Sequence, residues 1–129
     1  VTCNSSSSRF VKENISDVSD EEAAKLLDIR TVTYDYKNGN PGDKGWIGVI
    51  AEEVYGTIPR AVIQPEEPYG DLAGMIERGE DTSELGIDYA TFIPYLIKLC
   101  QMQQRQIGAL EKRVSALEGG TSDTSPSGD

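Results

Sequence analysis

The clearest pattern in the sequence is a repeat with alternating spacings of three and four residues over the last third of the chain. Its members are Ile93, Leu96, Cys100, Gln103, Ile107, Leu110, Val114 and Leu117. This spacing is typical of the a and d positions of a left-handed coiled coil. A helix over 93–117 would be about 37 Å long at 1.5 Å per residue. With Ile93 at position a, Arg113 and Glu118 fall at g and the following e, where an ion pair between chains can form.

The same helix could instead pack back on the globular part of its own chain. The apolar stripe is narrow and flanked by Gln104, Arg105 and Gln106, which favours association between chains. β-Branched residues at a with Leu at d favour dimers, but Cys100 and Gln103 interrupt the stripe. The pattern therefore leaves two or three chains open. The pair Gly119-Gly120 predicts the end of the helix, and a polar, disordered tail is expected over 119–129.

Shorter elements are predicted before this helix. The sequence Ser19-Asp20-Glu21-Glu22 is a capping box, and it begins a helix to about Asp28 that presents Ala23, Leu26 and Leu27. Strands over 30–36 and 46–50, joined by the turn residues 38–42, predict a hairpin. A helix over 51–54 and strands over 61–63 and 85–89 follow. The predicted fold class is α+β: a small globular part with short helices and a few antiparallel strands, then a long coiled-coil helix.

Aromatic and glycine residues of the hairpin have structural interpretations. Tyr34, Tyr36 and Trp46 are expected in the core rather than as a ligand platform, and the strand from Trp46 is expected to be buried. Gly48 predicts close packing of another backbone. The sequence Gly-Asp-Lys-Gly at 42–45 lacks the spacing of a phosphate-binding loop, so it is interpreted as a turn.

Acidic residues outnumber basic ones by 22 to 12, which gives a net charge of −10. This charge argues against nucleic acid as a partner, and no apolar run reaches the roughly 20 residues that cross a bilayer. Eight of the acids lie between Glu66 and Asp88, where Arg78 is the one basic residue, and 64–84 is interpreted as a solvated acidic loop. Calcium binding by Glu66, Glu67 and Asp71 would need an alternating spacing that is missing. No metal or cofactor is therefore expected.

Histidine is missing from the sequence, and the two cysteines are Cys3 and Cys100. A Ser-His-Asp triad, a Cys-His pair and the common zinc sites are excluded within this chain. Catalysis would have to use Lys, Ser, Asp, Glu or Tyr. Two distant thiols do not form a disulfide framework, which favours a reducing compartment. Because the chain begins at Val1 rather than Met, a fragment or processed product of a longer protein is expected.

Four stretches, in this order, resemble the S74-type intramolecular chaperones found at the C-termini of phage tail fibres, tailspikes and endosialidases. They are Ser7 to Ile15, Tyr34 to Tyr36, Ile47 to Val54 with Pro59 and Val62 beyond it, and Ile87 to Tyr89 followed by Phe92, Ile93 and Leu96. The resemblance covers about 7–117. It implies a homotrimer that helps the preceding fibre fold and then cuts itself off.

The resemblance also implies a catalytic pair. Ser7 would be the nucleophile, Lys12 its base, and Ser6–Ser7 the bond that is cut. The serine run from Ser5 to Ser8 leaves the register open, with Ser6 and Ser8 as the alternatives. An extended chain would separate Ser7 from Lys12 by roughly 17 Å, and helical side chains meet at spacings of three and four rather than five. The pair therefore needs a special local turn or a lysine from a neighbouring chain.

These inferences define an expected organisation. Residues 1–8 form a linker with the cleavage site, 9–89 the globular chaperone part with the acidic loop 64–84, 90–118 the coiled coil, and 119–129 the tail. The expected partners are the chain itself as a homotrimer and the upstream fibre or spike segment, in the host cytoplasm during virion assembly. The alternative function is a non-catalytic trimerisation or host-binding tip module that stays on the fibre.

Overall fold

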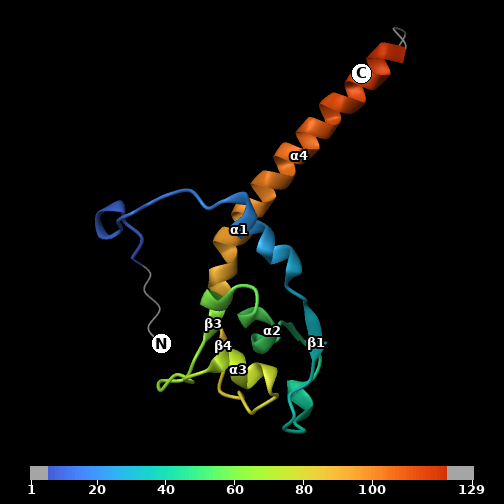
Figure 1. Cartoon of the computed structure of the whole chain (residues 1–129). Coiled ribbons are helices and arrows are strands. Elements are labelled where there is room, and N and C mark those ends of the chain that lie inside the picture. Colours follow the sequence, from blue (N-terminus) through green and yellow to red (C-terminus); the bar gives the residue numbers. More distant parts are fainter. Residues whose placement is uncertain (1–5, 122–129) are drawn as a thin grey trace.

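A long helix, α4, extends from a small body built of short elements, as the computed structural model shows (Figure 1). The structure describes residues 6–121. Its helices are α1 (Asp20–Ala24), α2 (Ala51–Tyr55), α3 (Leu72–Glu77) and α4 (Phe92–Thr121), and its strands are β1 (Val32–Tyr34), β2 (Trp46–Gly48), β3 (Val62–Ile63) and β4 (Gly86–Ile87). Five 3₁₀ turns complete the described part: η1 (Arg9–Val11), η2 (Lys25–Asp28), η3 (Pro41–Asp43), η4 (Pro59–Ala61) and η5 (Tyr89–Thr91). The predicted α+β class with a long C-terminal helix is confirmed.

Helix α1 begins where the capping box predicts. The Ser19 hydroxyl accepts a hydrogen bond of 3.1 Å from the backbone N–H of Glu22, and Ala23 is fully buried. The prediction for Leu27 was wrong, because its side chain is 64% exposed. The chain tightens into the 3₁₀ turn η2 after Ala24. A 3₁₀ turn has three residues rather than 3.6, so the side chains that follow rotate away from the α-helical face.

The predicted hairpin is present. Strands β1 and β2 are antiparallel, with Val32 opposite Gly48 and Tyr34 opposite Trp46. The predicted burial of this hairpin was wrong, because Trp46 is 48% exposed and Tyr36 is 52% exposed. A sheet of two strands has no third strand or second layer over its outer face, so part of its apolar surface stays in water.

The core of the body lies where α2, η4 and the start of α4 meet. Its buried residues are Val54, Ile58, Ala61 and Phe92. Strands β3 and β4, both predicted from the sequence, form a second antiparallel pair beside it, with Val62 opposite Ile87. Leu26 and Ile29 pack against these residues from earlier in the chain, so the body folds around the base of α4.

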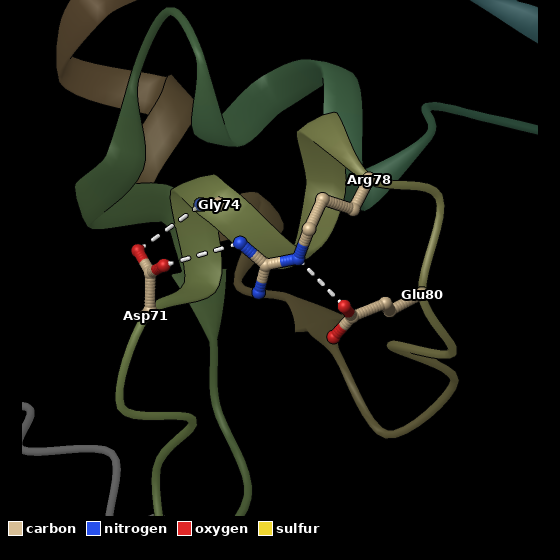
Figure 2. Close-up of polar contacts among 4 residues, drawn as sticks. All are labelled: Asp71, Gly74, Arg78 and Glu80. Carbon is tan, nitrogen blue, oxygen red and sulfur yellow. Dashed lines mark hydrogen bonds and ion pairs between the residues drawn. The ribbon is translucent and has the colours of Figure 1, made fainter.

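The acidic segment 64–84 is not a loop throughout, because it contains helix α3 (Figure 2). Asp71 caps the helix by accepting a hydrogen bond of 3.1 Å from the Gly74 N–H. Arg78 pairs with Asp71 at 3.6 Å and with Glu80 at 2.6 Å. Leu72 is buried, and it fixes α3 to the body. A short helix needs only one such anchor and a cap, and this signal is too small to recognise among the seven acids of 64–84.

Helix α4 carries two apolar stripes. The inward stripe is formed by Phe92, Tyr95, Leu99 and Met102, at positions g and c of the heptad, and all four are buried or half-buried. Helix α1 packs on this side. Its Glu22 accepts a hydrogen bond of 2.5 Å from the Tyr95 hydroxyl, and its Asp20 lies 3.2 Å from Arg105.

The outward stripe is the heptad pattern of the sequence. Its large apolar members are 48% to 70% exposed: Ile93, Leu96, Ile107, Leu110, Val114 and Leu117. The alternative that α4 packs on its own body is therefore correct for the first turns of the helix. It packs through the other stripe, however, and leaves the heptad positions uncovered in the single chain.

Helix α4 is longer than predicted. It runs through Gly119 to Thr121 instead of ending at the glycine pair. Glycine weakens a helix by about 1 kcal/mol relative to alanine, but it keeps its N–H and does not clash, so it does not force an end. The predicted disordered tail from 122 onwards lies outside the described residues. Among the helices of 6–121, none has the length and apolarity needed to cross a membrane.

Candidate active site

The predicted catalytic residues lie in the arm, which we define as residues 6–18. The arm leaves α1 and extends away from the body, with the turn η1 near its far end (Figure 1). Ser8 caps η1 through its hydroxyl, which accepts a hydrogen bond of 3.1 Å from the Phe10 N–H. The Val11 N–H donates to the Ser8 carbonyl at 3.0 Å. This single turn reverses the direction of the chain between Ser7 and Lys12.

Ser7 and Lys12 are brought together by that turn. The Nζ of Lys12 donates a hydrogen bond of 2.6 Å to the Oγ of Ser7. Both residues that flank η1, Ser8 and Lys12, have extended backbones, so the two side chains can turn toward each other across it. Of the two routes that the spacing of five allowed, the structure has the local turn within one chain.

The geometry also separates the neighbouring serines. The Ser8 hydroxyl accepts a hydrogen bond from the Phe10 N–H as the cap of η1, whereas the Ser7 hydroxyl accepts one from Lys12 Nζ. Ser6 lies one residue further out and is exposed. Ser5 lies outside the described residues. Of Ser7 and Ser8, it is therefore the Ser7 hydroxyl that contacts Lys12.

Solvent surrounds this pair. Ser7, Lys12 and the residues between them are exposed, and Phe10 is 95% exposed. A lysine acts as a base only in its neutral form, and burial is one of the means by which proteins favour that form. The single chain therefore brings Ser7 and Lys12 into contact but leaves both side chains exposed to water.

A second group of motif residues meets at the hairpin, and its arrangement was not predicted. Tyr34 and Tyr36 touch edge to face with centroids 5.1 Å apart, and their hydroxyls are 3.1 Å apart. The Tyr36 hydrogen bond and then burial raise the pKa of Tyr34 to about 12. The Tyr89 hydroxyl accepts a hydrogen bond of 3.3 Å from the Val49 N–H.

Gly48 explains why these tyrosines can come so close. A Cβ atom at this position would lie 2.6 Å from the Tyr89 hydroxyl and 3.2 Å from the Tyr34 ring. Gly48 was predicted to allow close approach of a backbone, but the atoms that approach belong to side chains. Three of the four stretches that carry the family resemblance thus meet at one point of the body.

One protein-family model matches part of the chain. The model of the Peptidase_S74 family, described as chaperone of endosialidase, matches residues 7–63. No curated protein matches the sequence. The matched segment begins at Ser7, includes Lys12, and continues through the hairpin and α2 to the end of β3. It ends before α3 and α4. The match supports an S74-type intramolecular chaperone domain in this part of the chain.

Proposed function

We propose that this chain is a self-releasing assembly chaperone, which helps an upstream fibre or spike segment to fold and trimerise and then cuts the Ser6–Ser7 bond. The observation that carries the proposal is the 2.6 Å contact between Lys12 Nζ and Ser7 Oγ. This contact falls at the first residue of the family match. The pair is thus at the boundary between the chaperone domain and whatever precedes it.

The outward stripe of α4 supports self-association. Six large apolar side chains at heptad positions are about half exposed or more in the single chain. Burying such a side chain contributes about 1.5–3 kcal/mol, so the stripe is stabilised when it meets other copies. The family resemblance favours three copies. The partners in this proposal are two further copies and the upstream segment of the same polypeptide, in the host cytoplasm during virion assembly.

The proposed cleavage needs no group from outside the chain except water. Neutral Lys12 takes the proton of the Ser7 hydroxyl while Oγ attacks the carbonyl carbon of Ser6. The C–N bond of Ser6–Ser7 breaks, the lysine returns the proton to the new amine of Ser7, and an ester joins Oγ to Ser6. Water then hydrolyses the ester, which gives a carboxylate on Ser6 and restores the hydroxyl of Ser7.

Assembly is the proposed trigger. The pair is in contact but solvated in the single chain. Burial against neighbouring chains or the folded fibre would favour the neutral lysine. Cleavage would then report that assembly is complete, which is the order a chaperone requires.

The test is expression of the chain with its upstream segment, followed by mass spectrometry of the products. We expect a new N-terminus at Ser7, which is lost in Ser7→Ala and in Lys12→Ala. Lys37→Ala is the matched control at an exposed lysine in the hairpin turn, and Ser6→Ala and Ser8→Ala test the register. A precursor that stays intact although it is trimeric would support the non-catalytic module instead.

A second measurement tests the trigger. Leu110→Asp in the outward stripe should hold the chain as monomers, and we expect its cleavage to slow at least tenfold, because burial that shifts a lysine pKa by one unit changes the neutral fraction about tenfold. Cleavage of this monomer at the rate of the unaltered protein would contradict the role of assembly and leave the Ser–Lys pair intact as a proposal.

A further inference from the structure

An open apolar hollow lies beside the base of α4. It measures about 470 Å³, and its walls come from η2, β2 and α4. Its apolar lining includes Leu26, Ile29, Val49, Phe92, Leu96 and Leu99. Ile47 of β2 also lines it and is 75% exposed. The single chain thus leaves a concave apolar surface in contact with water.

The hollow is continuous with the outward stripe. Leu96 belongs to both, because it occupies position d of the heptad and also lines the hollow. Phe92 and Leu99 occupy position g, which lies beside the a/d seam. In a parallel coiled coil a residue at g faces the residue five positions later, at e, of the neighbouring chain. The g-to-e pairing that would place Arg113 beside Glu118 of a second copy would also place Phe92 beside Ile97 of that copy.

The composition of the e and g positions agrees with this pairing. Ile97 is 55% exposed although it lies outside the a/d seam. Beyond the body, the later e positions are Gln104, Glu111 and Glu118, and the later g positions are Gln106 and Arg113. The e and g positions are thus apolar in the part of α4 that packs on the body, and polar in the later part of α4 that extends beyond the body. A coiled coil in which the α4 helices contacted only one another would not need an isoleucine at position 97.

We infer that the hollow is a docking site for a second copy of this chain, and that Ile97 of one copy inserts into the hollow of the next. This inference rests on the proposed parallel association. The segment that matches the chaperone family supplies three residues that line the hollow, Leu26, Ile29 and Val49. Each body is then completed by its neighbour, so folding of the body and association of the chains are coupled.

The experiment is photo-cross-linking in the full chain. p-Benzoylphenylalanine replaces Ile97, and equal amounts of ¹⁵N-labelled and unlabelled protein are mixed by refolding before irradiation. We expect mixed-isotope cross-links from position 97 to 26–31 or 46–49. The same probe at Gln104, one heptad further along, is the control, and we expect it to reach only the neighbouring α4. Cross-links from position 97 that stay within one copy, or that miss both segments, overturn the inference.

A side-chain variant tests the coupling independently of the probe. In Ile97→Ser we expect amide exchange over 26–31 and 46–49 to become about tenfold faster or more, because a buried apolar side chain is lost. Gln104→Ser should leave that exchange unchanged, and unchanged exchange in Ile97→Ser contradicts the inference. Sedimentation separates the two proposals: a trimer without the cross-links refutes only the docking site, whereas a monomer refutes the proposed association with it.

Discussion

The two apolar stripes of α4 differ in how much of each is covered, although they share the same first turns of one helix. The inward stripe is covered by α1 and the core of its own chain, and Phe92 and Leu99 are less than 10% exposed. The outward stripe keeps about half of its apolar surface in water. The periodic pattern that dominated the sequence is therefore the one that the single chain does not use. The strength of a sequence pattern therefore does not show which face of a helix packs within its own chain.

The largest expected effect comes from a charge in the outward stripe. Leu110→Asp places a carboxylate in the proposed seam, where burying it without a partner costs several kcal/mol. We expect association to weaken at least about a thousandfold, measured by sedimentation, while each chain keeps its fold through the inward stripe. Ser115→Asp, at the outer position b, is the control. If Leu110→Asp associates as well as Ser115→Asp does, the outward stripe is not the interface.

A truncation in the inward stripe should lower the stability of each chain and leave its association with other copies unchanged. Leu99→Ala removes a side chain that is 7% exposed, and such truncations cost about 2–5 kcal/mol. We expect this loss in urea unfolding at a fixed protein concentration, with the oligomeric state retained by the later heptads. Gln101→Ala, on the exposed side, should change little. Loss of association in Leu99→Ala at low urea would show that the two stripes cannot be separated.

A smaller effect is expected inside the body. Gly48→Ala forces a Cβ atom to within 2.6 Å of the Tyr89 hydroxyl, and overpacking of this kind costs about 1–3 kcal/mol. Thermal unfolding should show the loss, with association unchanged. Gly42→Ala is the control, because nothing lies within 4 Å of its Cβ. Tyr89→Phe in the same chain removes the clashing oxygen, so it should restore part of the stability of Gly48→Ala.

The smallest effect is a pH dependence of the contact between α1 and α4. Hydrogen bonds from Tyr95 and then from Lys25 hold the pKa of Glu22 below its usual range. The ionised carboxylate therefore stabilises the fold above the pKa of the unfolded chain, and this contribution is lost as the pH falls through the lower folded pKa. We expect the melting temperature of Glu22→Gln to fall less between pH 6 and 3 (roughly the range around a Glu pKa) than that of the unaltered protein. Glu21→Gln, at an exposed neighbour, should retain the full dependence.

Elements with a local or periodic signal were predictable. The capping box placed α1, the turn residues placed the hairpin, and the heptads placed α4. The class of the fold followed from these three signals, because each one reports a backbone conformation that neighbouring residues determine. The positions of the candidate pair, Ser7 and Lys12, came from the family resemblance.

Features that depend on what covers a surface were not predictable. Burial of Trp46 was expected from its strand, but no layer of the described chain covers it. The second stripe of α4 was hidden by the stronger heptad, since Tyr95 and Leu99 matter only where α1 lies. The turn between Ser7 and Lys12 depends on one capping hydroxyl, that of Ser8, in a run of identical residues. The sequence alone does not distinguish the serine that caps the turn from the serine that contacts Lys12.

The attachment of the arm determines what a cut at Ser6–Ser7 would disturb. The arm joins the body at Ser19, where α1 is held to α4 by the Tyr95–Glu22 and Arg105–Asp20 contacts. A cut at the far end of the arm would leave all the strands and core residues described within 6–121 on the same side of the cut. The proposed cut would therefore leave the described fold of the remaining chain intact.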